Sequence, residues 1–206
     1  MKIIALQNRR KCLTALKLEN GEELLLDTEI VIMRDLKPGV SIDDPDALLY
    51  ESDFKRAKSR ALWYLSRGDL SEKGLAEKLK TAGFGEKAAQ AAVERMAELG
   101  LIDDEKYARR LLESLTMSGA SEKEIYFKLK NKGIPSDIAK EVLSESETDE
   151  SEKIKGLLYT KYQNKLETQE GVQKVIASLA RKGFSFSDIK DALRAYNEEI
   201  ICEEDI

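Results

Sequence analysis

The sequence predicts a mainly α-helical protein of three tandem three-helix repeats, preceded by a small antiparallel β unit. A phrase that ends in glycine recurs with a period of 50 residues, at Gly83, Gly133 and Gly183. Charged residues make up 35% of the chain, aromatic residues make up 6% and only three residues are proline, a composition that favours solvated helices. Such repeats indicate one supersecondary unit copied along the chain, and three copies are expected to form an elongated array.

The repeated phrase reads as the end of a helix, then a glycine, then an apolar residue. Aligned at the glycines, the apolar positions of the copies match in three sets: Leu75, Ile125 and Val175; Leu79, Leu129 and Leu179; Phe84, Ile134 and Phe184. We therefore expect Gly83, Gly133 and Gly183 to be structural, as left-handed residues at which each middle helix ends.

Residues 1–46 are expected to form the β-rich unit, with three or four strands. Four short apolar runs have the length of strands: 3–6, 12–18, 24–26 and 29–33. Asn20-Gly21 is a strong signal for a hairpin turn between the second and third runs. Because so small a sheet is marginal alone, we expect it to pack on another element. The segment 43–46, Asp-Asp-Pro-Asp, indicates a boundary before the helices.

The helical part divides into repeat 1 (51–102), repeat 2 (103–150), repeat 3 (151–201) and an acidic tail (202–206) that we expect to be frayed. Each repeat is expected to contain three amphipathic helices of roughly 12 to 18 residues.

Polar residues at the predicted helix starts have the types that cap helices. Ser71 is placed to cap the middle helix of repeat 1, and Asp103 or Asp104 to cap the first helix of repeat 2. Ser121 with Glu124 fits a capping box. Pro135 suits the first position of the next helix.

The composition gives no support for catalysis, a cofactor or a metal site. The chain has no histidine, no Walker-type lysine loop and two cysteines, Cys12 and Cys202, outside any C-x-x-C pattern. The densest acidic group, Asp103-Asp104-Glu105, can be interpreted as a metal site or as a helix N-terminus, and the second interpretation is favoured. We expect no catalytic residues and no enzyme activity, and two reduced thiols.

Hydropathy predicts a cytoplasmic protein with no membrane partner. The first apolar run, 3–6, is too short for a signal peptide, and no stretch approaches the roughly 20 apolar residues of a membrane span.

Basic residues near the repeated glycines are the candidate contacts to a partner. The net charge is −5, and by our count only the segment 51–100 is net positive. The candidate residues are Arg56, Arg60, Arg67, Lys78, Lys80, Lys128, Lys130, Lys132, Arg181 and Lys182. Cations in a last helical turn also complement the helix dipole. Contacts to phosphates or to an acidic protein surface are the alternative, and the two interpretations are compatible.

Trp63 and Tyr64 lie side by side in the predicted first helix. An aromatic residue among apolar neighbours favours core packing for Trp63 and a position at the edge of the core for Tyr64.

These residues together resemble the RecX family of bacterial recombination regulators over about residues 55–200. The resemblance is carried by the segments 61–67 (Ala-Leu-Trp-Tyr-Leu-Ser-Arg), 70–84 and 129–134, and most specifically by 99–108, which contains Leu-Ile-Asp-Asp-x-x-Tyr-Ala with Asp103, Asp104 and Tyr107. These last three residues are expected to be structural. The β-rich start resembles an extra segment of some family members.

The resemblance implies a monomeric, non-enzymatic protein that binds the filament of the RecA recombinase and modulates its recombination and ATPase activity in DNA repair and the SOS response. Inhibition is the expected effect, although the sequence itself does not distinguish it from filament stabilisation. Direct binding of single- or double-stranded DNA is the alternative function. Because repeat 3 has Ser178 and Ala180 in place of the lysines, and the chain is net acidic, binding to DNA is expected to be weak.

Overall fold

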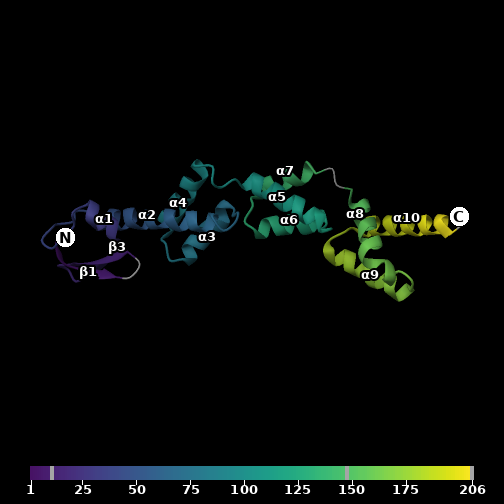
Figure 1. Ribbon diagram of the computed structural model, residues 1–206, viewed down its shortest axis with the longest axis horizontal. Helices are drawn as coiled ribbons and strands as arrows, with labels where there is room; N and C mark the ends of the chain where they lie inside the picture. Colours follow the sequence, from purple (N-terminus) through teal and green to yellow (C-terminus); the bar gives the residue numbers. More distant parts are fainter. Residues whose placement is uncertain (10–11, 147–148, 205–206) are drawn as a thin grey trace. The chain divides into compact units, whose positions relative to one another are not determined.

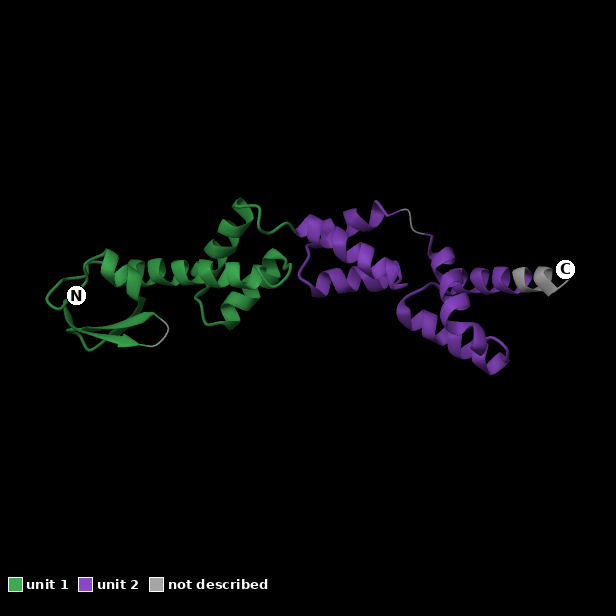
Figure 2. Cartoon of the chain, viewed as in Figure 1, with its two compact units in different colours: residues 1–103 green, residues 104–206 purple. Residues whose placement is uncertain are grey.

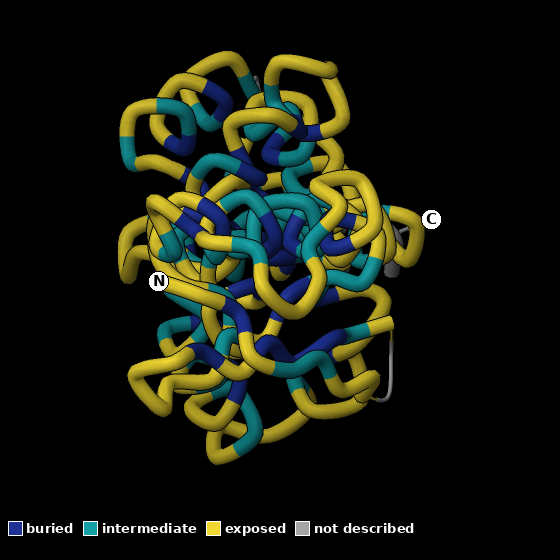
Figure 3. Tube along the Cα trace, turned by 90° about the vertical axis from the view of Figure 1, so that its left-hand side faces the viewer, coloured by how far each residue is buried: buried dark blue, intermediate teal, exposed yellow. Residues whose placement is uncertain are grey.

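The computed structural model describes residues 1–9, 12–146 and 149–204, with side chains as far as residue 198. The chain forms two compact units, residues 1–103 and 104–206 (Figures 1 and 2). Unit 1 holds a three-stranded antiparallel sheet and repeat 1, and unit 2 holds repeats 2 and 3. Buried and exposed stretches alternate along the chain (Figure 3), which is the pattern of amphipathic helices.

The sheet has the strand order β1-β2-β3, with β1 at Ile3–Arg9, β2 at Leu13–Leu18 and β3 at Glu23–Asp27. The turn predicted at Asn20-Gly21 joins β2 to β3, and Gly21 has a φ of +87° there. A positive φ carries little cost for glycine, because it has no Cβ.

The fourth apolar run forms a helix, not a strand, so the sheet has three of the three or four strands expected. α1 spans Thr28–Met33, and the side chain of Asp27 caps it by accepting from the backbone N–H of Glu29 at 3.0 Å. Ile30 and Val31 are buried, whereas the two residues after them are exposed. A local cap and a one-sided apolar face therefore prevail over the β propensity of Ile-Val-Ile.

One long helix connects the sheet to repeat 1. α2 spans Pro45–Leu65, starts with proline in its first turn and is capped by the Asp44 carboxylate, which accepts from Ala47 N–H at 2.9 Å. Leu48 packs in the core of the sheet, whereas Ala57 and Ala61 lie in the core of repeat 1. The small sheet is thus stabilised by the same helix that begins the repeat.

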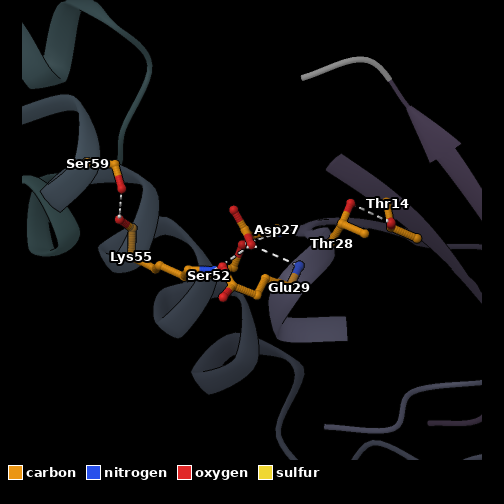
Figure 4. Close-up of polar contacts among 7 residues, drawn as sticks. All are labelled: Thr14, Asp27, Thr28, Glu29, Ser52, Lys55 and Ser59. Atoms are coloured by element: carbon orange, nitrogen blue, oxygen red, sulfur yellow. Dashed lines mark hydrogen bonds and ion pairs between the residues drawn. The ribbon is translucent and has the colours of Figure 1, made fainter. Parts of the chain in front are cut away.

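A polar network fixes the end of β3 against α2 (Figure 4). Lys55 Nζ lies 2.9 Å from the Asp27 carboxylate and also pairs with Glu29, and the backbone N–H of Asp27 donates to Ser52 Oγ at 2.7 Å. Lys55 and Ser52 belong to α2, so the sheet and helix are joined by polar as well as apolar contacts.

Repeat 1 is completed by α3 at Glu72–Thr81 and α4 at Glu86–Glu98. As predicted, Ser71 caps α3, accepting from Gly74 N–H at 3.0 Å. The core of repeat 1 is made from α2, α3, α4 and the segment after α4, and its fully buried members include Ala57, Ala61, Leu75, Leu79, Ala89 and Ala92.

Repeat 2 consists of α5 at Asp104–Met117, α6 at Glu122–Asn131 and α7 at Ser136–Ser144. Ser121 caps α6, but the reciprocal half of the expected capping box is replaced, because the Glu124 carboxylate pairs with Lys128 at 2.7 Å. Pro135 occupies the N-cap of α7 and not its first helical position, one residue earlier than expected.

Repeat 3 departs furthest from the predicted plan. Its first helix divides into α8 at Glu150–Leu157, a π-helical turn η1 at Leu158–Tyr162 and a short 3-10 turn η2 at Gln163–Lys165. The wider turn buries Tyr162, whose hydroxyl lies 2.9 Å from Ser178 Oγ on α9. α9 spans Gln169–Lys182, and α10 spans Phe186–Glu204.

The helices of the repeats vary in length more than the expected 12 to 18 residues, from 8 in α8 to 21 in α2. The backbone of α10 continues through residues 202–204, where a frayed tail was expected. The last two residues of that tail, 205–206, lie outside the described part of the chain.

The three copies of the repeated phrase end their helices in the same way. Gly83, Gly133 and Gly183 have φ values of +91°, +86° and +99°. The apolar residue after each glycine donates its N–H to the matched leucine five residues earlier, as Phe84 does to Leu79 at 3.2 Å. This is the Schellman motif, and it explains why the leucine, the glycine and the apolar residue recur at fixed spacing.

Candidate functional site

The predicted basic residues occur mostly at the ends of the three middle helices. Lys78 and Lys80 lie in the last turn of α3, Lys128 and Lys130 in that of α6, and Arg181 and Lys182 in that of α9. Lys132 is the C-cap residue of α6. Arg56 and Arg60 belong to α2, and Arg67 follows it.

In repeat 1 three of these cations gather around two aromatic rings. The guanidinium carbon of Arg67 lies 3.8 Å from the centre of the Trp63 ring, and that of Arg60 lies 5.1 Å from it. Lys78 Nζ is 5.4 Å from the Tyr64 ring, which packs edge-on against Trp63. We call these five residues the Trp63 cluster. Such cation–π contacts fix the direction of a cation while leaving its N–H groups open to an anion.

The cations of the Trp63 cluster are not neutralised by carboxylates. Arg60, Arg67 and Lys78 form no ion pair with any carboxylate in the described part of the chain. Their neighbours differ, since Lys80 pairs with Glu86 at 2.6 Å and Arg56 pairs with Asp53 at 3.2 Å.

A shallow groove of about 320 Å³ runs beside the Trp63 cluster. α2 contributes Arg56, Arg60 and Trp63, Phe84 forms a further wall, and the sheet contributes Leu13 and Asp27. Burial raises the pKa of Asp53, against the opposing effect of Arg56, with which it pairs. The sheet therefore contributes one apolar and one acidic side chain to a groove whose cations come from α2.

The prediction for Trp63 was wrong, whereas the prediction for Tyr64 is confirmed. Trp63 is 42% exposed, and Tyr64 is partly buried at the edge of the core of repeat 1. The inward face of α2 is formed by Ala57 and Ala61, and Trp63 falls outside that stripe. Apolar neighbours alone do not indicate on which side of the stripe a residue lies. The two small alanines four residues apart are the signal that could have located the inward face.

The remaining candidates lie in unit 2 and have nearer polar partners. Lys128 and Lys182 flank the Glu124 carboxylate at 2.7 Å and 3.9 Å, and Lys130 Nζ donates to Ser136 Oγ at 2.7 Å. Arg181 is exposed, and its Nε donates to the carbonyl of Ala177 at 3.2 Å. Phe127 and Lys123 line a groove with Arg181 and Lys182, although neither was singled out in the sequence.

The predicted structural residues of repeat 2 lie at the start of α5. This helix begins at Asp104, directly after Asp103, and Tyr107 packs against the core of the repeat. Among the residues that the structure describes, no group of acidic or cysteine side chains has the arrangement of a metal site. In the same residues, no helix combines the length and apolar character needed to cross a membrane.

Comparisons with known proteins agree with this architecture. The family description "RecX, first three-helix domain" matches residues 57–96, and "RecX, third three-helix domain" matches residues 148–193. Regulatory protein RecX of Caldanaerobacter subterraneus subsp. tengcongensis is 31% identical over 169 residues, which cover 81% of this chain and 85% of the relative. Regulatory protein RecX of Streptococcus gordonii is 28% identical over 196 residues, which cover 93% and 76%.

Solved structures give the same result. A crystal structure of regulatory protein RecX superposes with a TM-score of 0.63 and 25% identity, covering 92% of this chain and 98% of that one. RecX from Lactobacillus salivarius superposes with a TM-score of 0.62 and 25% identity, covering 70% and 97%.

The tandem three-helix repeats, with cations presented at helix ends, define a helical-repeat protein. Sequence identity and coverage then identify the family. The chain belongs to the RecX family of regulatory proteins.

Proposed function

We propose that this protein regulates the RecA recombinase, binding the RecA filament and lowering its ATP hydrolysis and strand exchange during DNA repair. The observation that carries the proposal is the Trp63 cluster, in which three cations are oriented by aromatic rings and not neutralised. Membership of a family of regulatory proteins supports it. Electrostatic complementarity to an acidic protein surface would give such a cluster a fast and specific encounter.

The test is RecA-dependent ATP hydrolysis on single-stranded DNA, with and without the protein. At stoichiometric concentration we expect the hydrolysis rate to fall, and an unchanged rate would rule the proposal out. The double variant Arg60→Gln with Arg67→Gln should lose most of the effect. Lys73→Gln with Lys87→Gln is the matched control, because it removes two exposed cations of unit 1 outside the cluster and should keep the effect.

Direct binding of single-stranded DNA is the second candidate function. An exposed tryptophan flanked by arginines, beside a groove lined by Arg56 and Phe84, has the components of a stacking site for bases. Binding of an oligothymidylate should quench the fluorescence of Trp63, weaken with added salt, and weaken further in Arg56→Ala with Arg60→Ala. Unchanged fluorescence at low salt would exclude this function.

A further inference from the structure

A second cationic surface lies in unit 2, where repeats 2 and 3 meet. It is a groove of about 250 Å³ between α6 and the end of α9, and we call it the α6–α9 groove. α6 contributes Lys123, Phe127 and Lys128, and α9 with its C-cap contributes Arg181, Lys182 and Gly183.

The two walls of the groove are held together by the helix cap of repeat 2. Ser121 Oγ donates to the backbone carbonyl of Lys182 at 2.6 Å, while also accepting from Glu124 N–H at 3.1 Å. A Cβ on Gly183 would lie 2.9 Å from Ser121 Oγ and 3.1 Å from Lys123 Cβ. Only a residue without a side chain permits this approach, so the groove exists before a partner binds.

The groove carries a surplus of positive charge. Its single carboxylate, Glu124, faces Lys128 from its own helix and Lys182 from α9. The oxygen nearer Lys182 is buried and accepts no hydrogen bond. Lys123 and Arg181 pair with no carboxylate among the described residues, so they remain open to an incoming anion.

The groove also has an exposed apolar wall. The Phe127 side chain is 56% exposed, although the two residues on the opposite face of the same helix, Ile125 and Leu129, are fully buried. An aromatic ring beside unpaired cations fits a ligand in which an apolar group adjoins negative charge.

The geometry favours carboxylates over phosphates as that negative charge. Phosphate sites commonly use free backbone N–H groups at a helix N-terminus. At the start of α6 these groups are engaged, since Glu122 N–H donates to Glu150 at 3.1 Å and Glu124 N–H donates to Ser121.

We propose that the α6–α9 groove docks an acidic segment of a partner protein, with an apolar side chain of that segment packed on Phe127. The carboxylates of the segment would pair with Lys123 and Arg181 at the rim. The identity of the partner rests on the proposed function, but the existence and chemistry of the groove do not.

The probe is a dye-labelled decapeptide of Glu and Asp with one central Phe, and binding to the full chain is followed by fluorescence anisotropy. Phe127→Ser should weaken binding about tenfold or more, and so should a peptide with Ser in place of Phe. Lys123→Gln with Arg181→Gln should weaken binding and flatten its salt dependence. Lys140→Gln with Met117→Ser removes one exposed cation and one exposed apolar side chain outside the groove and should bind as the parent does.

Three results would overturn the proposal: no binding of the acidic peptide, equal binding of the peptide that lacks Phe, or tighter binding of a ten-residue oligothymidylate that Phe127→Ser abolishes. Circular dichroism of each variant confirms that the fold is retained. RecA-dependent ATP hydrolysis is measured separately on the same proteins. If the parent protein regulates RecA but does not bind the peptide, the groove proposal alone is refuted. If the parent protein binds the peptide but does not change RecA-dependent ATP hydrolysis, the proposed function alone is refuted.

Discussion

Repeat 1 and repeat 2 carry the same Lys-x-Lys phrase before their glycines, yet they place those lysines in different surroundings. In repeat 1, Lys78 lies over an aromatic ring, whereas its counterpart Lys128 is held by the carboxylate of Glu124. The residue that Trp63 matches at the 50-residue period is Glu113 in repeat 2. The comparison teaches that the partner of the matched lysine lies on the first helix in repeat 1 and on the middle helix itself in repeat 2, while the shared phrase sets only the helix end.

The largest expected effect tests whether unit 1, which holds repeat 1, and unit 2, which holds repeats 2 and 3, unfold separately. Leu79→Ala and Leu179→Ala each truncate a fully buried leucine and should cost about 2–5 kcal/mol of unfolding free energy. Trp63, the single tryptophan, reports only on unit 1. In urea, Leu79→Ala should lower the midpoint of the tryptophan transition and Leu179→Ala should leave it unchanged. Equal shifts for both would show that the chain unfolds as one body.

Next in size is a change at the glycines of repeats 1 and 3. Gly83→Ala should cost about 1 kcal/mol, because the positive φ is strained for alanine but nothing lies within 4 Å of the added Cβ. Gly183→Ala should cost about 2–3 kcal/mol, because the same strain is joined by contact with Ser121 and Lys123. Urea unfolding followed by circular dichroism measures both. Equal costs would show that the close approach of α6 and α9 is unimportant.

A smaller effect is expected at the helix caps of unit 2. Ser121→Ala should cost about 2 kcal/mol, since it removes both the cap of α6 and the bond to the Lys182 carbonyl. Thr168→Ala is the control, because exposed Thr168 only caps α9, and it should cost about 1 kcal/mol. Thermal unfolding separates the two. If Ser121→Ala loses no more stability than Thr168→Ala, the hydrogen bond from Ser121 to the Lys182 carbonyl does not contribute to the stability of unit 2.

The smallest effect concerns a single exposed ion pair in repeat 1. The hydrogen bond from Lys80 lowers the pKa of the Glu86 carboxyl. A lowered pKa means that the pair stabilises the folded state above the ordinary pKa of glutamate, and that this stabilisation is lost as the pH falls through the lowered value. In Lys80→Met the pKa of Glu86 should rise towards its ordinary value in an NMR titration. High salt should reduce the difference between parent and variant, because the pair is exposed.

Much of the scaffold could be predicted from local signals. The caps at Ser71 and Ser121 and the hairpin at Gly21 follow from residue types that favour one backbone conformation, and the structure confirms them. The π-helical turn that ends at Tyr162 could not be predicted, because it depends on how that ring packs and on the contact of its hydroxyl with Ser178 on another helix.

The surface chemistry was less predictable than the helices. Exposure of Trp63 depends on the rotation of α2 about its axis, which two alanines decide. Lys123 and Phe127 have no distinguishing sequence pattern, and they form a groove only because α9 approaches α6. The periodicity of a single helix does not indicate which other helices it will contact. The role of these residues in a groove could therefore be recognised only from the folded structure.

α2 has a mechanical consequence for unit 1. It is a single helix of 21 residues, about 30 Å long at 1.5 Å per residue, and it has no glycine or proline after Pro45. Its first turns are anchored in the core of the sheet and its last turns carry Trp63. A displacement of the sheet would therefore also move the Trp63 cluster, because α2 connects the two without a hinge.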